Sequence, residues 1–221
     1  MKKIIYTAFL VLLSVFSSNA QDFRGCKGFI DFYGGMGVGN EKESYSAGYS
    51  TISEIEPRMS VGLNVTGGYQ ITDYLFAGIG FGGYTVLDRY KEEYNGDKGS
   101  DYYFPAIMLP VFVDCRWTLN INRKITPFVD LKLGYQFRCS LEEGKITYNY
   151  QKEDLFLNQE AGFYCQPTVG VRFGKASGFN LGITFNPTIR QSLYYGRNYK
   201  NLTLLKKLSQ GTVMLSLGAD F

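Results

Sequence analysis

The chain has 221 residues, enough for one ordinary domain or one β-barrel, and 45% of them are hydrophobic. That composition excludes a polytopic helical membrane protein, which needs several apolar runs of ~20 residues. The 23 basic and 20 acidic residues leave a net charge of +3 with no basic cluster, so we expect no nucleic-acid partner. The sequence has no His, the commonest general base and metal ligand, so we expect no catalysis, metal site or cofactor.

The first 20 residues have the three parts of a secretory signal peptide. Lys2 and Lys3 precede an apolar run over residues 4–16, and small residues at 18 and 20 come before Gln21. The alternative, an uncleaved membrane anchor, is disfavoured because this run is too short to cross ~30 Å of hydrocarbon as a helix. We therefore predict cleavage near Ala20, which leaves residues 21–221 as one domain.

The rest of the chain alternates between apolar and polar residues with a period of two, which indicates half-buried strands. In residues 59–70, for example, Val61 and Leu63 fall on one face, and Asn64 and Thr66 fall on the other. An even number of strands permits a closed antiparallel barrel with both termini on the same side. The eight predicted strands are residues 28–38, 59–70, 75–87, 107–117, 127–138, 163–173, 179–189 and 212–221.

The connections between these strands alternate in length. Short turns on one side and long polar loops on the other are typical of an outer-membrane barrel, with the turns in the periplasm. We expect the strand prolines Pro110 and Pro167 to mark bulges, because proline cannot donate to a ladder. The short connections are 71–74, 118–126 and 174–178, and the long ones are 39–57, 88–103, 140–160 and 194–207.

The composition of the two faces predicts which one meets lipid. The polar face consists mainly of Gly, Asn, Gln, Ser and Thr, which suit the narrow interior of an eight-stranded barrel, so the apolar face must point outward. In the alternative, a soluble secreted barrel that binds an apolar ligand, the apolar face would point inward. Aromatic residues near the strand ends predict two interfacial girdles. They are Tyr69, Tyr74, Trp117, Phe173, Phe179 and Phe221 on the turn side, and Tyr84, Phe104, Tyr135, Phe137 and Phe163 on the loop side.

The signal peptide, the eight strands and the ending Gly218-Ala219-Asp220-Phe221 resemble the small outer-membrane β-barrel proteins (OmpA- and OmpX-like, the outer membrane protein beta-barrel domain family). Residues 109–137 also look like the central hairpin of these proteins. The resemblance implies an all-β fold, an eight-stranded antiparallel up-and-down transmembrane β-barrel in a Gram-negative outer membrane. It also implies that Phe221 belongs to a carboxy-terminal signal read by the barrel-assembly machinery. We expect no cell-wall-binding domain after the barrel.

Charged residues on the polar face form the candidate site. A turn near Asn122 or Arg123 would place Asp114 beside Lys132 and Arg116 beside Asp130, and pairing is needed because an unpaired ion inside the barrel costs several kcal/mol. We interpret these residues as a filling that closes the lumen; the alternative is an ion-conducting or substrate-binding constellation. The predicted network is Asp114, Arg116, Asp130, Lys132, Arg138 and Arg172, with Asp31, Arg190 and Asp220 further round.

We therefore expect a structural or surface-interaction protein embedded in outer-membrane lipid, and the first alternative is a small porin-like pore. Loop tyrosines either bind an extracellular ligand or simply extend the barrel above the membrane, and the sequence leaves both open. Three cysteines on the apolar face are expected to be small wall residues, although a Cys139–Cys165 disulfide is also open. These sets are Tyr45, Tyr49, Tyr90, Tyr94, Tyr148, Tyr150, Tyr194, Tyr195 and Tyr199, and Cys115, Cys139 and Cys165.

Overall fold

The structure is a computed structural model, and it describes most of the chain after residue 24. The predicted signal peptide, residues 1–20, lies outside the described residues. Within the described part, no helix is long and apolar enough to cross a membrane. The described ranges are 25–38, 44–47, 50–54, 59–95, 97–119, 123–139, 142–148, 151–159, 161–174, 177–196 and 203–221.

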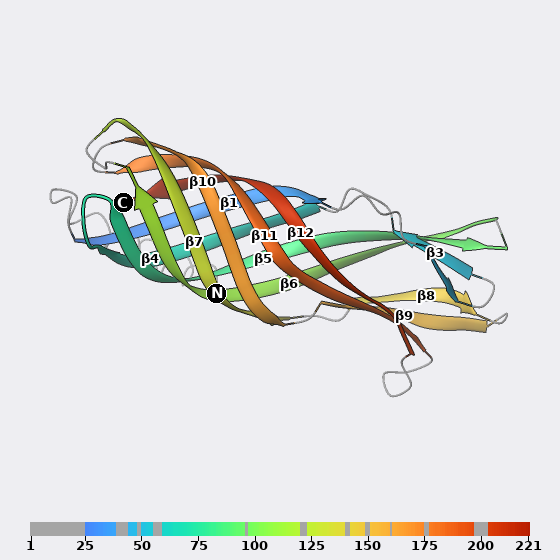
Figure 1. The fold of residues 1–221 in the computed structure, drawn as a ribbon. Helices are drawn as coiled ribbons and strands as arrows, with labels where there is room; N and C mark the ends of the chain where they lie inside the picture. Colours follow the sequence, from blue (N-terminus) through green and yellow to red (C-terminus); the bar gives the residue numbers. More distant parts are fainter. Residues whose placement is uncertain are drawn as a thin grey trace, which may run out of the picture.

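Eight of the described strands form a closed antiparallel barrel. Around the barrel the order is β10-β7-β6-β5-β4-β1-β12-β11, and a β10–β11 pairing closes the ring (Figure 1). The predicted eight-stranded antiparallel barrel is confirmed. The barrel strands are β1 (Cys26–Val38), β4 (Met59–Gln70), β5 (Leu75–Tyr94), β6 (Asp97–Thr118), β7 (Ile125–Arg138), β10 (Gly162–Gly174), β11 (Gly178–Gly196) and β12 (Thr203–Asp220).

The two faces of the barrel strands have the predicted sidedness. Val61 on β4 and Leu215 on β12 are 60% and 64% exposed on the outer wall, whereas Asn64 and Thr66 are buried inside. A soluble barrel that binds an apolar ligand would need the reverse arrangement, so that alternative is wrong. The apolar side chains cover the outside of the barrel, and the polar ones fill its lumen.

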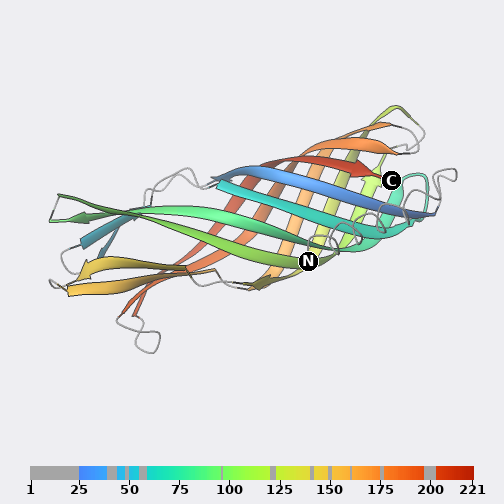
Figure 2. The same cartoon turned by 180° about the vertical axis from the view of Figure 1, so that it is seen from behind.

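Four short strands lie beyond the barrel at its loop-side end. They are β2 (Ser44–Ala47), β3 (Ser50–Glu54), β8 (Glu142–Tyr148) and β9 (Gln151–Gln159). Strand β3 pairs with the far part of β5, and β9 pairs with both β8 and the far part of β11. Figures 1 and 2 show these strands beside the long β5–β6 hairpin, which projects past the barrel. We call this part of the molecule the extension.

The extension corrects the prediction that residues 39–57, 88–103, 140–160 and 194–207 are loops. Strand β5 runs to Tyr94 and β6 starts at Asp97, so the segment 88–103 is a hairpin. The sequence Asn95-Gly96 is a strong hairpin signal, and Asn95 has the positive φ of 48° that such a turn needs. Alternation fades here because both faces of a strand outside the membrane can be solvated.

The strands do not bulge at Pro110 or Pro167, where we expected bulges. The pairs Val111↔Phe81 and Met108↔Tyr84 keep one register on either side of Pro110, and the register is also continuous through Pro167. A proline removes one donor from the ladder but adds no residue, so the register survives. The described strands shift register elsewhere. One shift lies in β11 around Pro187, between Asn186 and Ile189, and two others lie between Leu193 and Tyr194 of β11 and between Lys91 and Glu93 of β5.

The cysteines are unpaired, and the geometry excludes the Cys139–Cys165 disulfide. Cys26, Cys115 and Cys139 are exposed and Cys165 is partly exposed, all as free thiols. Cys165 lies opposite Leu133 on β7, whereas Cys139 follows the end of that strand, about 20 Å further along. A disulfide requires Cα atoms within about 7 Å of each other.

Candidate functional site: the lumen of the barrel

Strands β6 and β7 bring the four predicted charges into facing pairs. The register places Asp114 opposite Lys132 and Arg116 opposite Asp130, as the predicted turn position requires. All four side chains point into the lumen and are at most 3% exposed. Alternation therefore fixes both the orientation of these residues and their neighbours on the adjacent strand.

These four residues form one cluster with Asp31, which reaches it from β1. Arg116 Nη2 donates to Asp130 Oδ2 at 3.0 Å and to Asp31 Oδ2 at 3.1 Å. Lys132 Nζ donates to Asp130 Oδ2 and lies 3.3 Å from Asp31 Oδ2 and 3.6 Å from Asp114 Oδ2. We call Asp31, Asp114, Arg116, Asp130 and Lys132 the central cluster.

Aromatic rings surround the cations of the central cluster. The guanidinium carbon of Arg116 is 4.0 Å from the ring centre of Phe29 and 4.9 Å from that of Phe128. Lys132 Nζ is 6.0 Å from the ring centre of Phe112. A cation desolvated against aromatic faces is stabilised by the ring quadrupole. The rings thus fill the space beside the ion pairs while contributing to their stability.

Arg172 belongs to a second ion pair, nearer the turn-side end of the barrel. Its Nε and Nη2 donate to the two carboxylate oxygens of Asp220 at 3.0 and 2.7 Å, and its Nη1 donates to the Gly174 carbonyl at 2.9 Å. Because β11 lies between β10 and β12, this bidentate pair spans two strand neighbours across the seam that closes the barrel. Arg172 is therefore separate from the central cluster.

The buried charges that face the lumen balance. Among the described residues they comprise four cations and four carboxylates. A buried charge is tolerated when it is paired and hydrogen-bonded, so a balanced set can occupy a dry interior. The cations are Lys27, Arg116, Lys132 and Arg172, and the carboxylates are Asp31, Asp114, Asp130 and Asp220.

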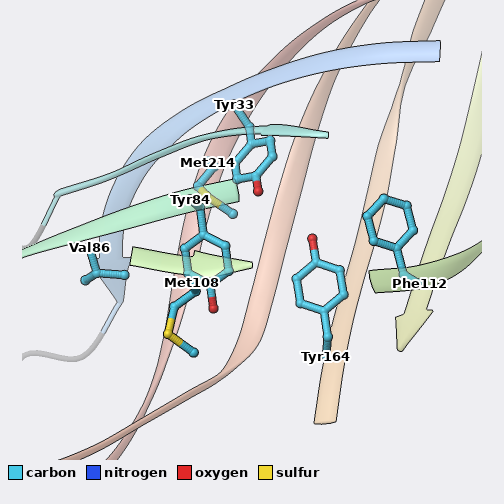
Figure 3. Packing of buried hydrophobic residues seen from close by; sticks show 7 residues of the cluster. All are labelled: Tyr33, Tyr84, Val86, Met108, Phe112, Tyr164 and Met214. Carbon is cyan, nitrogen blue, oxygen red and sulfur yellow. The ribbon is translucent and has the colours of Figure 1, made fainter. Parts of the chain in front are cut away.

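A layer of tyrosines on the loop side of the central cluster joins two amides that lie beside it, Asn64 opposite Asp31 and Gln166 opposite Lys132. Asn64 Nδ2 and the Tyr164 hydroxyl donate to Gln166 Oε1 at 2.7 and 2.8 Å, and the Tyr33 hydroxyl donates to Asn64 Oδ1 at 3.3 Å. Figure 3 shows the hydroxyls of Tyr33 and Tyr164 pointing toward each other, among the buried side chains of this region. We call Tyr33, Asn64, Tyr84, Tyr164 and Gln166 the tyrosine–amide layer.

Tyr84 is in this layer, so its prediction as a girdle residue is wrong. It is 3% exposed, and its hydroxyl donates to Gln136 Oε1 at 2.6 Å. The strand parity that places Ile79 and Phe81 outside places Tyr84 inside, so the signal was present in the sequence. The outer wall does expose Tyr69, Tyr74, Trp117, Phe173 and Phe179 on the turn side and Tyr135, Phe137 and Phe163 on the loop side.

The remaining predicted residues lie apart from both groups. Arg138 is exposed at the loop-side end of β7, opposite Met108, and so does not join the central cluster. Phe221 is partly exposed, and its backbone exchanges hydrogen bonds of 2.9 and 3.1 Å with Gly28 of β1. The side chains of Phe104 and Arg190 lie outside the described part of the structure.

The family is identified by a match that covers nearly the whole sequence. The outer membrane protein beta-barrel domain matches residues 8–221. The chain belongs to this family. Its members are outer-membrane barrels, so the exposed apolar belt is the surface that lipid covers, and the protein is located in the outer membrane.

The solved structures to which this chain is similar have low sequence identity with it. Neisserial surface protein A is 9% identical, with 89% of this chain and 96% of that chain covered and a TM-score of 0.45. OprG of Pseudomonas aeruginosa is 11% identical, with 89% of this chain and 96% of that chain covered and a TM-score of 0.49. The N-terminal β-barrel domain of P. aeruginosa OprF is 10% identical, with 90% of this chain and 98% of that chain covered and a TM-score of 0.33. Comparison with curated proteins gives no match.

Proposed function

We propose that this barrel is a non-enzymatic structural or surface-interaction protein, with a lumen closed by its own side chains and an extension that contacts extracellular partners. The observation that carries this is the stacking of the central cluster and the tyrosine–amide layer in the lumen of an eight-stranded barrel. Such a barrel is only wide enough for side chains to fill. Every named member of the two groups is buried, so the layers leave little bore for a solute.

The extension supports the surface role because it is a packed structure. Leu155 and Phe156 of β9 are 0% and 2% exposed, although they lie beyond the barrel. Tyr94, Tyr194 and Tyr195 are half-buried there. Tyrosine provides a large contact area at low entropic cost, which suits a recognition surface. The extracellular ligand would bind at this end of the molecule.

A planar-bilayer recording tests the closed lumen. Purified protein should first migrate differently on a detergent gel with and without boiling, which establishes that the barrel is folded. The folded protein should then give no stable single-channel openings, whereas a Tyr33→Ala/Tyr164→Ala variant, which removes two rings from the lumen, should give some. Stable openings of the unaltered protein would overturn the closed lumen.

A narrow pore is the second candidate, and one observation favours it. Both carboxylate oxygens of Asp114, Nε and Nη1 of Arg116 and Nε2 of Gln166 have no hydrogen-bond partner among the described residues. Buried polar atoms of this kind are commonly satisfied by ordered water, so a hydrated path could pass these atoms. If the unaltered protein conducts and Asp114→Asn changes its cation-to-anion permeability ratio, the pore becomes the better assignment.

Targeting and insertion complete the proposal. We infer that the leader is removed near Ala20, and the intact mass of the purified protein, expected to begin at Gln21, tests this. We further infer that the barrel-assembly machinery reads the carboxy-terminal strand ending at Phe221, whose backbone pairs with β1. Phe221→Ala should lower the amount of heat-modifiable barrel in the outer membrane, while the refolding yield of the purified variant in detergent stays the same. An unchanged amount in the membrane would contradict this role.

A further inference from the structure

The lipid-facing wall is hollowed on β1, at Gly34. The hollow has a volume of about 610 Å³ and crosses strands β4, β1, β12 and β11. It is almost wholly apolar, and none of the side chains that the structure describes fills it. We call it the Gly34 groove, and its main lining residues are Gly34, Met36, Met59, Val61, Val213 and Leu215.

The groove exists because a residue without a side chain sits inside a ring of exposed apolar ones. Gly34 lies opposite Val61 on β4 and Leu215 on β12, and Phe32 and Met36 flank it along β1. Each of these four side chains is more than half exposed. They stand out from the wall around the glycine, so the missing side chain leaves a depression instead of a flat surface.

The height of the groove identifies what covers it. With a rise of ~3.3 Å per residue and a strand tilt of ~40°, Leu215 and Val213 lie roughly 15–20 Å above Phe221 along the barrel axis. Phe221 follows the turn-side end of β12, and Phe179 of the turn-side girdle pairs with Ala219, two residues before it. The groove is therefore near the middle of a hydrocarbon layer ~30 Å thick, where the only lipid group is an acyl chain.

Strand β12 continues past the groove to two adjacent basic residues. Lys207 and Lys206 pair with Ser192 and Leu193 of β11, in the part of β12 beyond the membrane. The same rise and tilt place Lys207 roughly 35 Å above Phe221, just outside the hydrocarbon on the extracellular side. An acyl chain that enters from that side brings its head group to this level, where positive charge favours an anionic lipid.

We propose that the Gly34 groove is a binding site for one acyl chain of an anionic lipid in the extracellular leaflet. The bound lipid covers the depression that Gly34 leaves in the wall, and its head group lies beside the Lys206–Lys207 segment. This site is distinct from the lumen and from the proposed surface role of the extension. Its test is therefore independent of whether the lumen conducts.

A filling variant tests the site without disturbing the strands. A Cβ at Gly34 would meet only the Cγ2 of Val61 at 3.2 Å and the Ser60 carbonyl oxygen at 3.7 Å, so Gly34→Leu occupies the groove from within. Gly67→Leu is the matched control, since Gly67 lies on the same outer wall near the turn side and a Cβ there meets nothing within 4 Å. Boiled and unboiled gel samples establish that both variants fold.

The measurement is native mass spectrometry of protein released from nanodiscs that contain equal phosphatidylglycerol and phosphatidylcholine with the same acyl chains. The unaltered protein and Gly67→Leu should retain one phosphatidylglycerol, and Gly34→Leu should lose it at least tenfold. Lys206→Gln/Lys207→Gln should still retain a lipid but no longer prefer the anionic one. Equal retention by Gly34→Leu would overturn the site, as would a dimer of the unaltered protein that Gly34→Leu abolishes, because a second copy would then be the occupant.

Discussion

Asp130 accepts from both cations of the central cluster, and this shared carboxylate explains how five charged side chains fit in a dry lumen. Its Oδ2 is contacted by Arg116 and by Lys132, while Asp31 reaches the same two cations from the opposite wall. Asp31, Arg116, Asp130 and Lys132 thus each have at least two partners of opposite sign within 4 Å, and Asp114 has one, Lys132. Removing a single member leaves buried charge uncompensated, which is more costly than never placing charges there.

Lys132→Met should destabilise the barrel, because it leaves Asp31, Asp114 and Asp130 facing only Arg116. Loss of one partner from a buried pair costs about 3–5 kcal/mol. We expect a loss of unfolding free energy of that order, measured by urea unfolding of the protein in lipid vesicles. Methionine keeps most of the side-chain volume, so the change reports on charge and not on a cavity.

The double variant Asp114→Asn/Lys132→Met is the control for this prediction. Asp114 loses its negative charge together with its partner, so the double variant should regain part of the stability that Lys132→Met loses. If Lys132→Met is as stable as the unaltered protein, the central cluster does not stabilise the fold.

The sequence could predict the ion pairs between adjacent strands but not those across the lumen. Facing pairs on adjacent strands follow from alternation and from the position of a turn, and so Asp114 could be matched with Lys132. Contacts across the lumen depend on the radius and shear of the closed barrel, which no local pattern contains. The contact of Asp31 with Arg116 and that of Asp220 with Arg172 therefore could not be predicted from the sequence and are known only from the closed barrel.

At the scale of the strand, neighbouring glycines on β1 have different roles because alternate residues face opposite sides. Gly34 faces the lipid, whereas Gly35 faces the lumen where β12 passes close by. A Cβ at Gly35 would lie 2.1 Å from the Val213 carbonyl oxygen and 2.5 Å from the Met214 Cα. These are backbone atoms of the neighbouring strand, so accommodating the methyl group would require β12 to move.

Gly35→Ala should lower the stability of the barrel by about 1–3 kcal/mol, the usual cost of overpacking. The matched change one residue away, Gly34→Ala, should be close to neutral. Urea unfolding in lipid vesicles compares the two variants under the same conditions. Equal stabilities would show that the close approach of β1 and β12 relaxes at no cost.

Strand patterns were reliable inside the membrane and poor outside it. A strand between lipid and lumen must place apolar residues on one face and polar residues on the other, and residues 59–70 show this alternation clearly. The far parts of β5 and β6 have no lipid face, so the segment 88–103 was predicted as a loop although it is a hairpin. The Asn95-Gly96 turn signal there outweighs the weak alternation.

For the molecule as a whole, the extension is an addition to a barrel that closes without it. Strand β6 has 22 residues and so extends roughly 55 Å along the barrel axis, about 25 Å more than the hydrocarbon layer requires. The pairings that close the barrel, β1 with β12 and β10 with β11, involve residues at membrane depth. Barrel stability and the surface role are therefore separable.

A shortened β5–β6 hairpin tests this separation. Replacing residues 90–102 by an Asn-Gly turn keeps the Arg89↔Tyr103 pair as the last rung of the hairpin. The shortened protein should still shift on a gel when boiled, with an unfolding free energy within about 1 kcal/mol of the original, because loops outside a core tolerate deletion. Migration as an unfolded band before boiling would mean that the barrel needs its extension.

The four free cysteines stand at different heights along this wall. Cys26 and Cys115 are exposed near the turn-side end, Cys165 is partly exposed beside Leu133 further up, and Cys139 is exposed just past β7. A thiol-reactive fluorophore on each one in turn, with the other three changed to serine, would report immersion through quenching by brominated lipids. The native cysteine positions can thus report how deeply the barrel sits in the bilayer.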